Sequence, residues 1–475
     1  MPAAAPALPA RVLSPSSAED EVLLSLGLGA DSAYILWRLL TEPAAHGIRE
    51  DFSNLTVVTS MTGDEWSDTI DLSERHLLPL MAEKGVRYVQ VARGGRWDAD
   101  GYAVLSDTRH SVHIEASGPW ALSDELRASG TLPMYSGGQH VCSIKYKGWV
   151  IDKWAKDHMP SGYRHIIGYD ADELKRARKD CGFTTNGRRP WYPLIAWRMS
   201  RPALLAELKL AFGVDWPKSY CVECPFPSVA ASRDAHLARA RRLPAEAAMA
   251  VCLEYVAHAL NPLTTLYAGG TSLADLLALD GNEAALAAAE EQLSSVMWMV
   301  LRVRRVLPAA RSKWCVDHHG PRCGRCAETP DSVRCPDCRG LPKQQCPPEQ
   351  LTDDCADPKR KGRVWRSVEH VGLPRARAAA TGMLRRVAAR RGLPVEQGAG
   401  VERVWITRRE ESYPTTEEFF VAVPNVVEAK EQPGFRPRWT AQTFRRRHQH
   451  DAAIARSGSS AGATTAPVPR ELVLA

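Results

Sequence analysis

The first half of the chain alternates between short apolar runs and stretches whose apolar residues recur at helical spacing. Residues 31–40 and 68–84 show the helical spacing, with apolar side chains three and four positions apart. The short runs lack alternation, which is typical of parallel strands covered on both faces. This order favours an α/β fold: a parallel sheet of about five strands, flanked by helices in right-handed crossovers. The runs with the length of buried strands are residues 22–26, 55–59, 86–91 and 163–167.

The second half has a different pattern, which predicts several appended regions. Residues 236–310 are rich in Ala, Leu and Arg with few helix breakers, which indicates several helices. Residues 401–424 alternate apolar and polar positions as a β-hairpin does. We expect a disordered leader at 1–20, an α/β domain at 21–235, a helical region at 236–310, a cysteine-rich module at 311–358, a basic region at 359–450 and a disordered tail at 451–475.

Composition narrows the class of protein and its compartment. The chain of 475 residues is 44% hydrophobic and 24% charged, which is ordinary for a globular protein. No run of about 18 apolar residues is present, so we expect no membrane span. The N-terminus lacks the basic and apolar segments of a secretory signal. Twelve cysteines then favour metal or redox chemistry in a reducing cytosol, so we expect a cytoplasmic protein, of unknown oligomeric state.

The loop after the first apolar run has the composition of a phosphate-binding turn. Its sequence, Ser25-Leu-Gly-Leu-Gly-Ala-Asp-Ser32, joins the first expected strand to the first expected helix. Gly27 and Gly29 allow a sharp turn and a close approach of the backbone to a ligand. Asp31 and Ser32 are residue types that cap a helix start, where free N–H groups and the helix dipole attract phosphate. The alternative is an ordinary βα turn that uses glycine only for its geometry.

This loop resembles the PP-loop, of the SGGxDS type, in the superfamily of N-type ATP pyrophosphatases and phosphoadenylyl-sulfate (PAPS) reductases. Gly29, Asp31 and Ser32 match that motif, whereas Gly27 and Leu28 stand where Ser and Gly are usual. It is not similar to a Walker P-loop, because no Gly-Lys-Ser/Thr follows. The resemblance implies the adenine nucleotide alpha hydrolase-like fold for the α/β domain.

Further segments, in the superfamily's order, are similar to its other motifs over Val22–Ser228. Thr62-Gly-Asp-Glu65 resembles the second motif, with Met61 in place of the usual Asp. The later ones are Cys142-Ser-Ile-Lys145, Gly168 followed by Glu173 and Arg176, Tyr192-Pro-Leu, and Cys221-Val-Glu-Cys224-Pro-Phe. The resemblance implies nucleotide binding by Ser25, Gly27, Gly29, Ala30, Asp31, Ser32, Thr62, Gly63, Asp64, Glu65, Lys145, Gly168, Glu173 and Arg176, and catalytic roles for Asp31, Cys142, Cys221 and Cys224.

Two groups of cysteines have the character of metal or redox sites. The first consists of two C-x-x-C hooks whose spacing predicts a structural Zn²⁺ site, formed by Cys323, Cys326, Cys335 and Cys338. A cysteine-rich loop without metal is the alternative. The second group is Cys142, Cys221 and Cys224. In the superfamily, cysteines at similar places hold an iron–sulfur cluster or carry sulfur, and Cys181 is a candidate fourth ligand. A zinc site or a redox pair remains open for this group.

Two reactions follow from the resemblance. In the first, ATP with Mg²⁺ adenylates a substrate oxygen, pyrophosphate leaves, and a sulfur nucleophile displaces AMP. The candidate cations beside the phosphates are Lys145, Lys147, Arg176 and Arg178. In the second, PAPS is the ligand and thiol attack on its sulfur gives sulfite. The chain has no cysteine after Cys355 to act from a C-terminal tail, which disfavours a simple PAPS reductase.

The late basic stretch points to a partner. Residues 359–391 contain eleven Lys or Arg and one acid, Glu369, which favours contact with DNA or RNA phosphates. Together with the PP-loop resemblance, this suggests sulfur or related modification of a nucleic acid. A nucleotide- and nucleic-acid-binding adaptor without catalysis is the alternative.

Overall fold

The computed structural model describes residues 8–133, 135–136, 139–183, 187–226, 230–311 and 356–444. They form two compact units, the first ending at Ser295 and the second beginning at Val296. This boundary lies inside the region 236–310 that the sequence predicted as one helical region.

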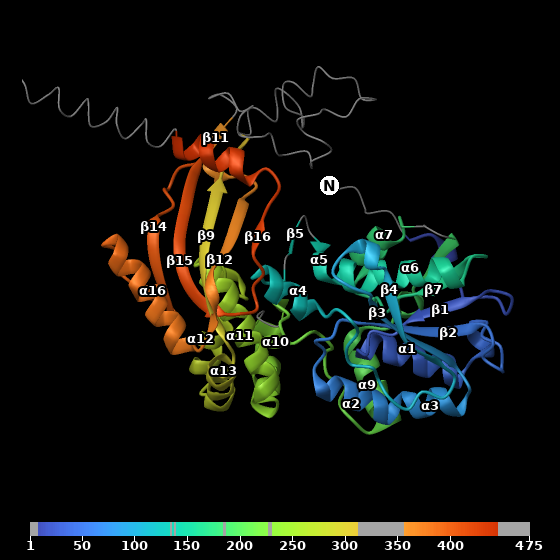
Figure 1. Ribbon diagram of the computed structural model, residues 1–475. Coiled ribbons are helices and arrows are strands. Elements are labelled where there is room, and N and C mark those ends of the chain that lie inside the picture. The colour runs from blue at the N-terminus through green and yellow to red at the C-terminus, as the bar shows by residue number, and fades with distance from the viewer. Residues whose placement is uncertain are drawn as a thin grey trace, which may run out of the picture. The chain divides into compact units, whose positions relative to one another are not determined.

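The first unit contains a six-stranded, mostly parallel sheet (Figure 1). Only β4 runs antiparallel, against β3 at one edge. The expected α/β fold is therefore confirmed as a Rossmann-like domain, with one antiparallel strand that the sequence did not predict. In spatial order the strands are β4 (Tyr102–Thr108), β3 (Arg87–Arg93), β2 (Leu55–Met61), β1 (Val22–Ser25), β7 (Tyr163–Ile166) and β8 (Arg188–Trp191).

Helices cover both faces of this sheet. On one face, α1 (Ala30–Thr41) and α9 (Arg201–Phe212) pack against Val22 and Leu24 of β1. On the other face, α6 (Trp149–His158) packs against Leu23 and Val58. Because successive side chains of a strand point to opposite faces, β1 supplies apolar residues to both layers. The other helices between residues 21 and 229 are α2 (Ser67–His76), α3 (Leu78–Glu83), α4 (Leu122–Ser129), α5 (Val141–Ser143), α7 (Leu174–Asp180) and α8 (Pro193–Ala196).

Two local expectations are wrong in this unit. The helical pattern at 68–84 is divided into α2 and α3, since Pro79 lies at the start of α3 and cannot donate to a preceding turn. The expected disordered leader is ordered from Ala10, where a short 3-10 turn begins. Val12 is buried beside Tyr192, whose amide donates to the Val12 carbonyl at 2.9 Å.

The expected helical region is confirmed only as far as Ser295. Its last part, Trp298–Leu307, is strand β9, and the helical prediction there is wrong. This strand carries Arg302, Arg304 and Arg305, which resemble the polar face of a helix in sequence but pair with glutamates across the sheet. The helices are α10 (Ala230–Arg242), α11 (Pro244–Leu260), α12 (Leu273–Leu279) and α13 (Glu283–Ser295). No single described helix has the length and apolarity to cross a membrane, although the bent pair Ser232–Arg242 and Pro244–Leu260 passes that test together.

The second unit is built on a six-stranded antiparallel sheet, which includes the expected hairpin at 401–424 (Figure 1). Helix α16 (Arg377–Arg391) packs on it through Ala380, Leu384 and Ala388. A separate ladder pairs β10 (Ala309–Arg311) with β11 (Ala356–Lys361). The predicted zinc cysteines lie between these strands, outside the described residues. The strands are, in spatial order, β13 (Glu396–Gly398), β14 (Val401–Thr407), β15 (Thr415–Pro424), β9, β12 (Trp365–Arg375) and β16 (Lys430–Glu431).

Candidate functional site

The strand order of the first sheet reverses between β1 and β7. Strands β2 and β3 lie to one side of β1, and β7 and β8 lie to the other. In doubly wound sheets, ligands bind outside the carboxyl ends of the strands at such a reversal. The glycine-bearing loop after β1 and the segment after β7 border this position, so the sequence-predicted loop lies at the expected edge.

The loop after β1 presents main-chain N–H groups toward this edge. Helix α1 begins at Ala30 with Gly29 as its N-cap, so Asp31 and Ser32 lie in the first turn, and the expectation that they cap the helix is wrong. Ser32 Oγ instead accepts from the Gly27 amide at 3.1 Å and donates to the Gly29 carbonyl at 3.1 Å. The amides of residues 28–32 have no acceptor within the described part of the chain. Five consecutive N–H groups with a helix dipole behind them suit an anion.

Leu28 departs from the PP-loop pattern, and the structure accommodates it. Its φ is 57°, in the left-handed region where glycine is usual, and its side chain is buried among core residues. Trp216 Nε1 donates to the Leu28 carbonyl at 3.2 Å, and Ser219 Oγ donates to the Gly27 carbonyl at 3.0 Å. The side chains of Trp216 and Ser219, far along the chain, therefore donate to two carbonyls of the loop. The loop's own amides at 28–32 keep no partner among the described residues.

Gly168 follows β7 and lies against the first turn of α1. A Cβ at this position would lie 3.1 Å from Asp31 Cβ and 3.2 Å from the Ser32 nitrogen. A glycine keeps the space in front of that amide open, which agrees with the predicted role of Gly168 beside the ligand.

Asp31 is bound on one side only. Its Oδ2 accepts from Arg201 Nη1 at 2.7 Å, whereas its Oδ1 is buried with no hydrogen-bond partner among the described residues. Burial raises the pKa of the Asp31 carboxyl; Arg201 opposes the shift, and Glu173 and Asp170 add to it. The sequence did not predict Arg201, which comes from α9, 170 positions away.

The predicted Glu173 and Arg176 lie near the same edge and pair with each other. They form an ion pair, and the Arg176 guanidinium stacks over the Tyr169 ring at 4.9 Å. Arg176 also interacts electrostatically with Asp31, so the structure brings this predicted pair close to the α1 start.

The segment Thr62–Glu65 after β2 divides into structural and site-facing residues. The amide of Ser123 donates to Asp64 Oδ2 at 2.7 Å, so Asp64 is buried and fixes the start of α4. Gly63 has a φ of 90°, and a Cβ there would meet Ala121. Thr62 and Glu65 instead face residues 216–224, here called the cysteine segment, which includes Cys221 and Cys224.

Glu65 and Thr62 contact side chains of residues that are far from them in sequence. Lys147 Nζ donates to Glu65 Oε1 at 3.0 Å, and Thr62 Oγ1 lies 3.2 Å from Cys221 Sγ. Although burial alone would lower it, Glu65 and Cys221 raise the pKa of Lys147. Lys147 lies on a π-helical turn, Ile144–Gly148, a distortion that often marks functional sites.

Lys145, the lysine predicted to bind the nucleotide, has a different partner. Its Nζ donates to both carboxylate oxygens of Glu125 at 2.6 Å. The Tyr146 hydroxyl donates to the same carboxylate at 2.6 Å. Lys147, two residues later, is therefore the lysine that faces the thiols.

The three predicted catalytic cysteines gather in one region. Cys142 and Cys221 pack against the same apolar cluster, and Cys142 interacts electrostatically with Cys224. Burial raises the pKa of each of the three thiols, that of Cys224 to about 12, while Lys147 opposes the shift. All three are therefore protonated at neutral pH. Cys181 packs in another cluster with Val12 and Tyr192, apart from them.

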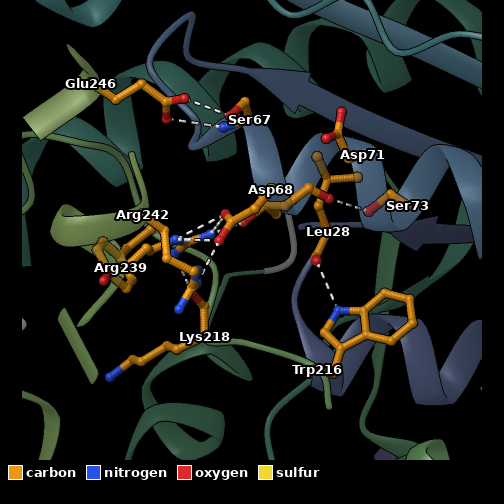
Figure 2. A network of polar contacts seen from close by, with 12 residues as sticks. Leu28, Ser67, Asp68, Asp71, Ser73, Trp216, Lys218, Arg239, Arg242 and Glu246 are labelled. Atoms are coloured by element: carbon orange, nitrogen blue, oxygen red, sulfur yellow. Dashed lines mark hydrogen bonds and ion pairs between the residues drawn. The ribbon is translucent and has the colours of Figure 1, made fainter. Parts of the chain in front are cut away.

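The cysteine segment spans two loops of the sheet edge. Upstream of the thiols, Trp216 and Ser219 bind the loop after β1, and Cys221 forms a β-bridge with Glu65 after β2. Arg239 of α10 holds this segment: its Nη1 donates to the Lys218 carbonyl at 3.0 Å (Figure 2).

Arg239 is the centre of a wider polar network (Figure 2). Its Nε donates to Asp68 Oδ1 at 2.9 Å, and its guanidinium stacks on Trp66 and Tyr220 at 5.0 and 5.1 Å. Arg242 pairs with Asp68 as well, at 3.1 Å. These contacts tie α10 to α2 and to the cysteine segment, and no sequence motif indicated them.

The donor sets do not have the arrangement of a metal centre. Across residues 8–311 and 356–444, apart from the short gaps, no three His, Cys, Asp or Glu side chains are grouped to hold an ion. An iron–sulfur cluster on Cys142, Cys221 and Cys224 therefore stays a prediction. The predicted zinc ligands Cys323, Cys326, Cys335 and Cys338 lie outside the described residues.

The fold and this edge define a Rossmann-like α/β protein with a loop at the strand-order reversal whose amides have no acceptor among the described residues, and with a thiol-bearing segment beside it. No protein-family model, curated protein or solved structure matches the chain.

Proposed function

We propose that the first unit binds an adenine nucleotide and catalyses adenylyl transfer in the manner of the PP-loop superfamily. The observation that carries this proposal is the row of unused amides at residues 28–32, at the switch point of the sheet. Amides of this kind bind phosphate oxygens through direct hydrogen bonds and the helix dipole. The openness of the backbone at Gly168 supports the same reading, because a larger residue would crowd those amides.

In the proposed reaction, an oxygen of the acceptor attacks the α-phosphorus of ATP. A bond forms between that oxygen and phosphorus, the bond to the bridging oxygen breaks, and pyrophosphate leaves. The amides at 28–32 would stabilise charge on the departing group. Mg²⁺, which is bound through one or two carboxylates and phosphate oxygens, would add positive charge there, and the unpartnered Oδ1 of Asp31 is its candidate ligand.

The thiols supply the second half of the proposal. A sulfur nucleophile attacks the adenylated carbon, and AMP leaves with its electron pair. Lys147 lies beside Glu65 and Cys221 and can stabilise a thiolate formed there, since its ammonium opposes the rise in the pKa of that thiol. The sulfur comes from a donor at the oxidation level of sulfide, which forms the new bond to carbon as the bond between that carbon and the AMP oxygen breaks. Cys142, Cys221 and Cys224 would hold this donor beside the carbon.

The test measures nucleotide binding and pyrophosphate release from ATP by anaerobically purified protein. Asp31→Ala is expected to lower pyrophosphate release by about tenfold or more, because it removes the carboxylate beside the phosphates. Asp71→Ala changes an exposed carboxylate on α2 and serves as the matched control. ATP binding without any pyrophosphate release would leave the adaptor alternative, and absence of ATP binding would refute the proposal.

PAPS reduction remains the second candidate for the same loop. A thiol would attack the sulfur of PAPS, displace the nucleotide, and release sulfite on attack by a second thiol, which forms a disulfide. The packing of Cys142 and Cys221 against one apolar cluster favours it. Sulfite formation from PAPS with a dithiol reductant, and none of pyrophosphate from ATP, would select this reaction.

We also propose that the second unit contacts DNA or RNA, in the cytoplasm. Exposed arginines on α16, among them Arg386 and Arg390, support this because they can face phosphates. Many other arginines of this unit are paired with glutamates, such as Arg302 with Glu418. Arg386→Gln with Arg390→Gln is expected to weaken nucleic-acid binding and reduce its salt dependence. An unchanged salt slope would refute the assignment.

A further inference from the structure

Polar side chains replace apolar ones on one face of the first sheet as its strands reach their carboxyl ends. Side chains two residues apart in a strand point to the same face. The positions that follow the apolar ones on this face therefore form a polar floor at the sheet edge. The apolar residues, clustered with α6, are Leu23, Val58 and Tyr163. The polar residues two positions later are Ser25, Ser60 and His165.

The two serines of this floor differ in what their hydroxyl groups do. Ser60 Oγ donates to the Tyr146 carbonyl at 2.7 Å. Ser25 Oγ lies 2.7 Å from His165 Nε2, with no second partner among the described residues. The direction of this contact decides whether Ser25 has a proton to offer a ligand.

Arg188 fixes that direction. Its Nε donates to His165 Nδ1 at 2.7 Å. Arginine has no acceptor, so Nδ1 is unprotonated and the neutral ring carries its proton on Nε2. That N–H donates to Ser25 Oγ, and the Ser25 hydroxyl proton is left for another acceptor.

The hydrogen-bonded chain from Arg188 through His165 to Ser25, here called the relay, is buried, and further contacts hold Arg188 in place. His165 is 5% exposed and Arg188 is 4% exposed. Arg188 Nη2 pairs with Asp180 Oδ2 at 2.6 Å, and the Tyr192 hydroxyl donates to the same oxygen at 2.7 Å. Burial and the Arg188 charge hold the pKa of His165 well below its usual range, which agrees with a neutral ring.

We infer that His165 and Arg188 are positioning residues that present the Ser25 hydroxyl as a hydrogen-bond donor to the nucleoside part of the bound nucleotide. The inference rests on the proposed function. Helix α1, whose start would take the phosphates, packs against Val22 and Leu24 on the opposite face of β1. Ser25 therefore points away from the helix that receives the phosphates, toward a ring nitrogen or a ribose oxygen.

The test compares the binding of ATP with that of inorganic pyrophosphate, which has no nucleoside. Ser25→Ala is expected to weaken ATP binding about five- to tenfold, the value of one hydrogen bond, and to leave pyrophosphate binding unchanged. Ser53→Ala, an exposed serine before β2, is the matched control. Equal weakening of both ligands, or no weakening of either, would overturn the inference. Wild-type protein that binds neither ligand would refute the proposed function and the inference with it.

The role of His165 needs a readout that a purely structural residue would not give. In ¹⁵N-histidine-labelled protein, the His165 signal is expected to show the Nε2–H tautomer, with or without ATP. A Nδ1–H tautomer or a charged ring would overturn the relay. His165→Gln can still donate to Ser25 and accept from Arg188, so it is expected to retain more ATP affinity than His165→Leu. Equal ATP affinity of the two folded variants would contradict the positioning role.

Discussion

Arg239 and Arg242 both bind the carboxylate of Asp68, the first from a buried position and the second from an exposed one. They are therefore a matched pair for testing what holds the cysteine segment in place. Arg239 has a side chain 3% exposed, whereas that of Arg242 is 61% exposed. Breaking a buried ion pair costs about 3–5 kcal/mol, and an exposed pair contributes about 0–1 kcal/mol. Asp68 is itself 26% exposed, and it keeps its ion pair with Arg242 when Arg239 is removed. The lower end of the range for a buried ion pair, about 3 kcal/mol, therefore applies to the loss of Arg239. We expect Arg239→Ala to destabilise this region by about 3 kcal/mol.

The loss should be local, because Arg239 also binds the Lys218 carbonyl and stacks on Tyr220. Hydrogen exchange of the Val222 amide, which donates to the Asp64 carbonyl at 2.8 Å, reports the opening of the segment. A loss of 3 kcal/mol corresponds to about 140-fold faster exchange, and Arg242→Ala should give at most about fivefold.

The amides of β15 in the second unit provide an internal reference, since they should exchange at an unchanged rate in both variants. Equal acceleration by Arg239→Ala and Arg242→Ala would refute the argument from burial. Unchanged exchange of Val222 in a folded Arg239→Ala protein would show that Arg239 does not hold the segment.

Three further predictions concern other parts of the chain. Gly168→Ala should weaken nucleotide binding by about tenfold, since the added Cβ would crowd the Ser32 amide. Gly398→Ala, at a position with open space around it, is the control and should leave the affinity unchanged. Equal affinities of the two variants would contradict this prediction. Burial and Arg239 lower the pKa of His236 in the folded protein to about 4. As the pH falls, His236 is therefore protonated in the unfolded chain before it is in the folded one, and the free energy of unfolding should decrease by about 2 kcal/mol from pH 7.5 to 5. Denaturation at both pH values checks this, and a His236→Phe variant with the same decrease would exclude His236 as its source. Metal analysis should find about one zinc ion per chain, lost in a Cys323→Ser variant; zinc retained by that variant would contradict the predicted site.

Most strands of the parallel sheet were predictable because a strand buried on both faces has a recognisable local sequence pattern. Continuous apolar runs gave β1, β2, β3 and β7, since strands covered on both faces need no polar alternation. Strand β4 was missed because its side chains are half-buried or exposed at one edge. The sequence indicates a helix at β9 because the arginines of this strand find their partners across the sheet, which periodicity cannot show.

The candidate site was predictable only where its residues are close in sequence. The glycine loop was found because conformation and spacing are local properties. The groups that complete it, Trp216, Ser219 and Arg201, approach from segments far along the chain and have no motif of their own. The choice between Lys145 and Lys147 depended on a π-helical turn and on which acid lay opposite each ammonium, and only the fold decides that.

The ladder of β10 and β11 brings two positions that are far apart in sequence onto adjacent strands. Arg311 lies opposite Ala356 in this antiparallel ladder, so these two positions are neighbours on adjacent strands. A two-residue hairpin turn could join these positions with little change in the ladder. A chain with such a turn in place of residues 312–355 should therefore still form this ladder, and its folding would show whether the six-stranded sheet needs those residues.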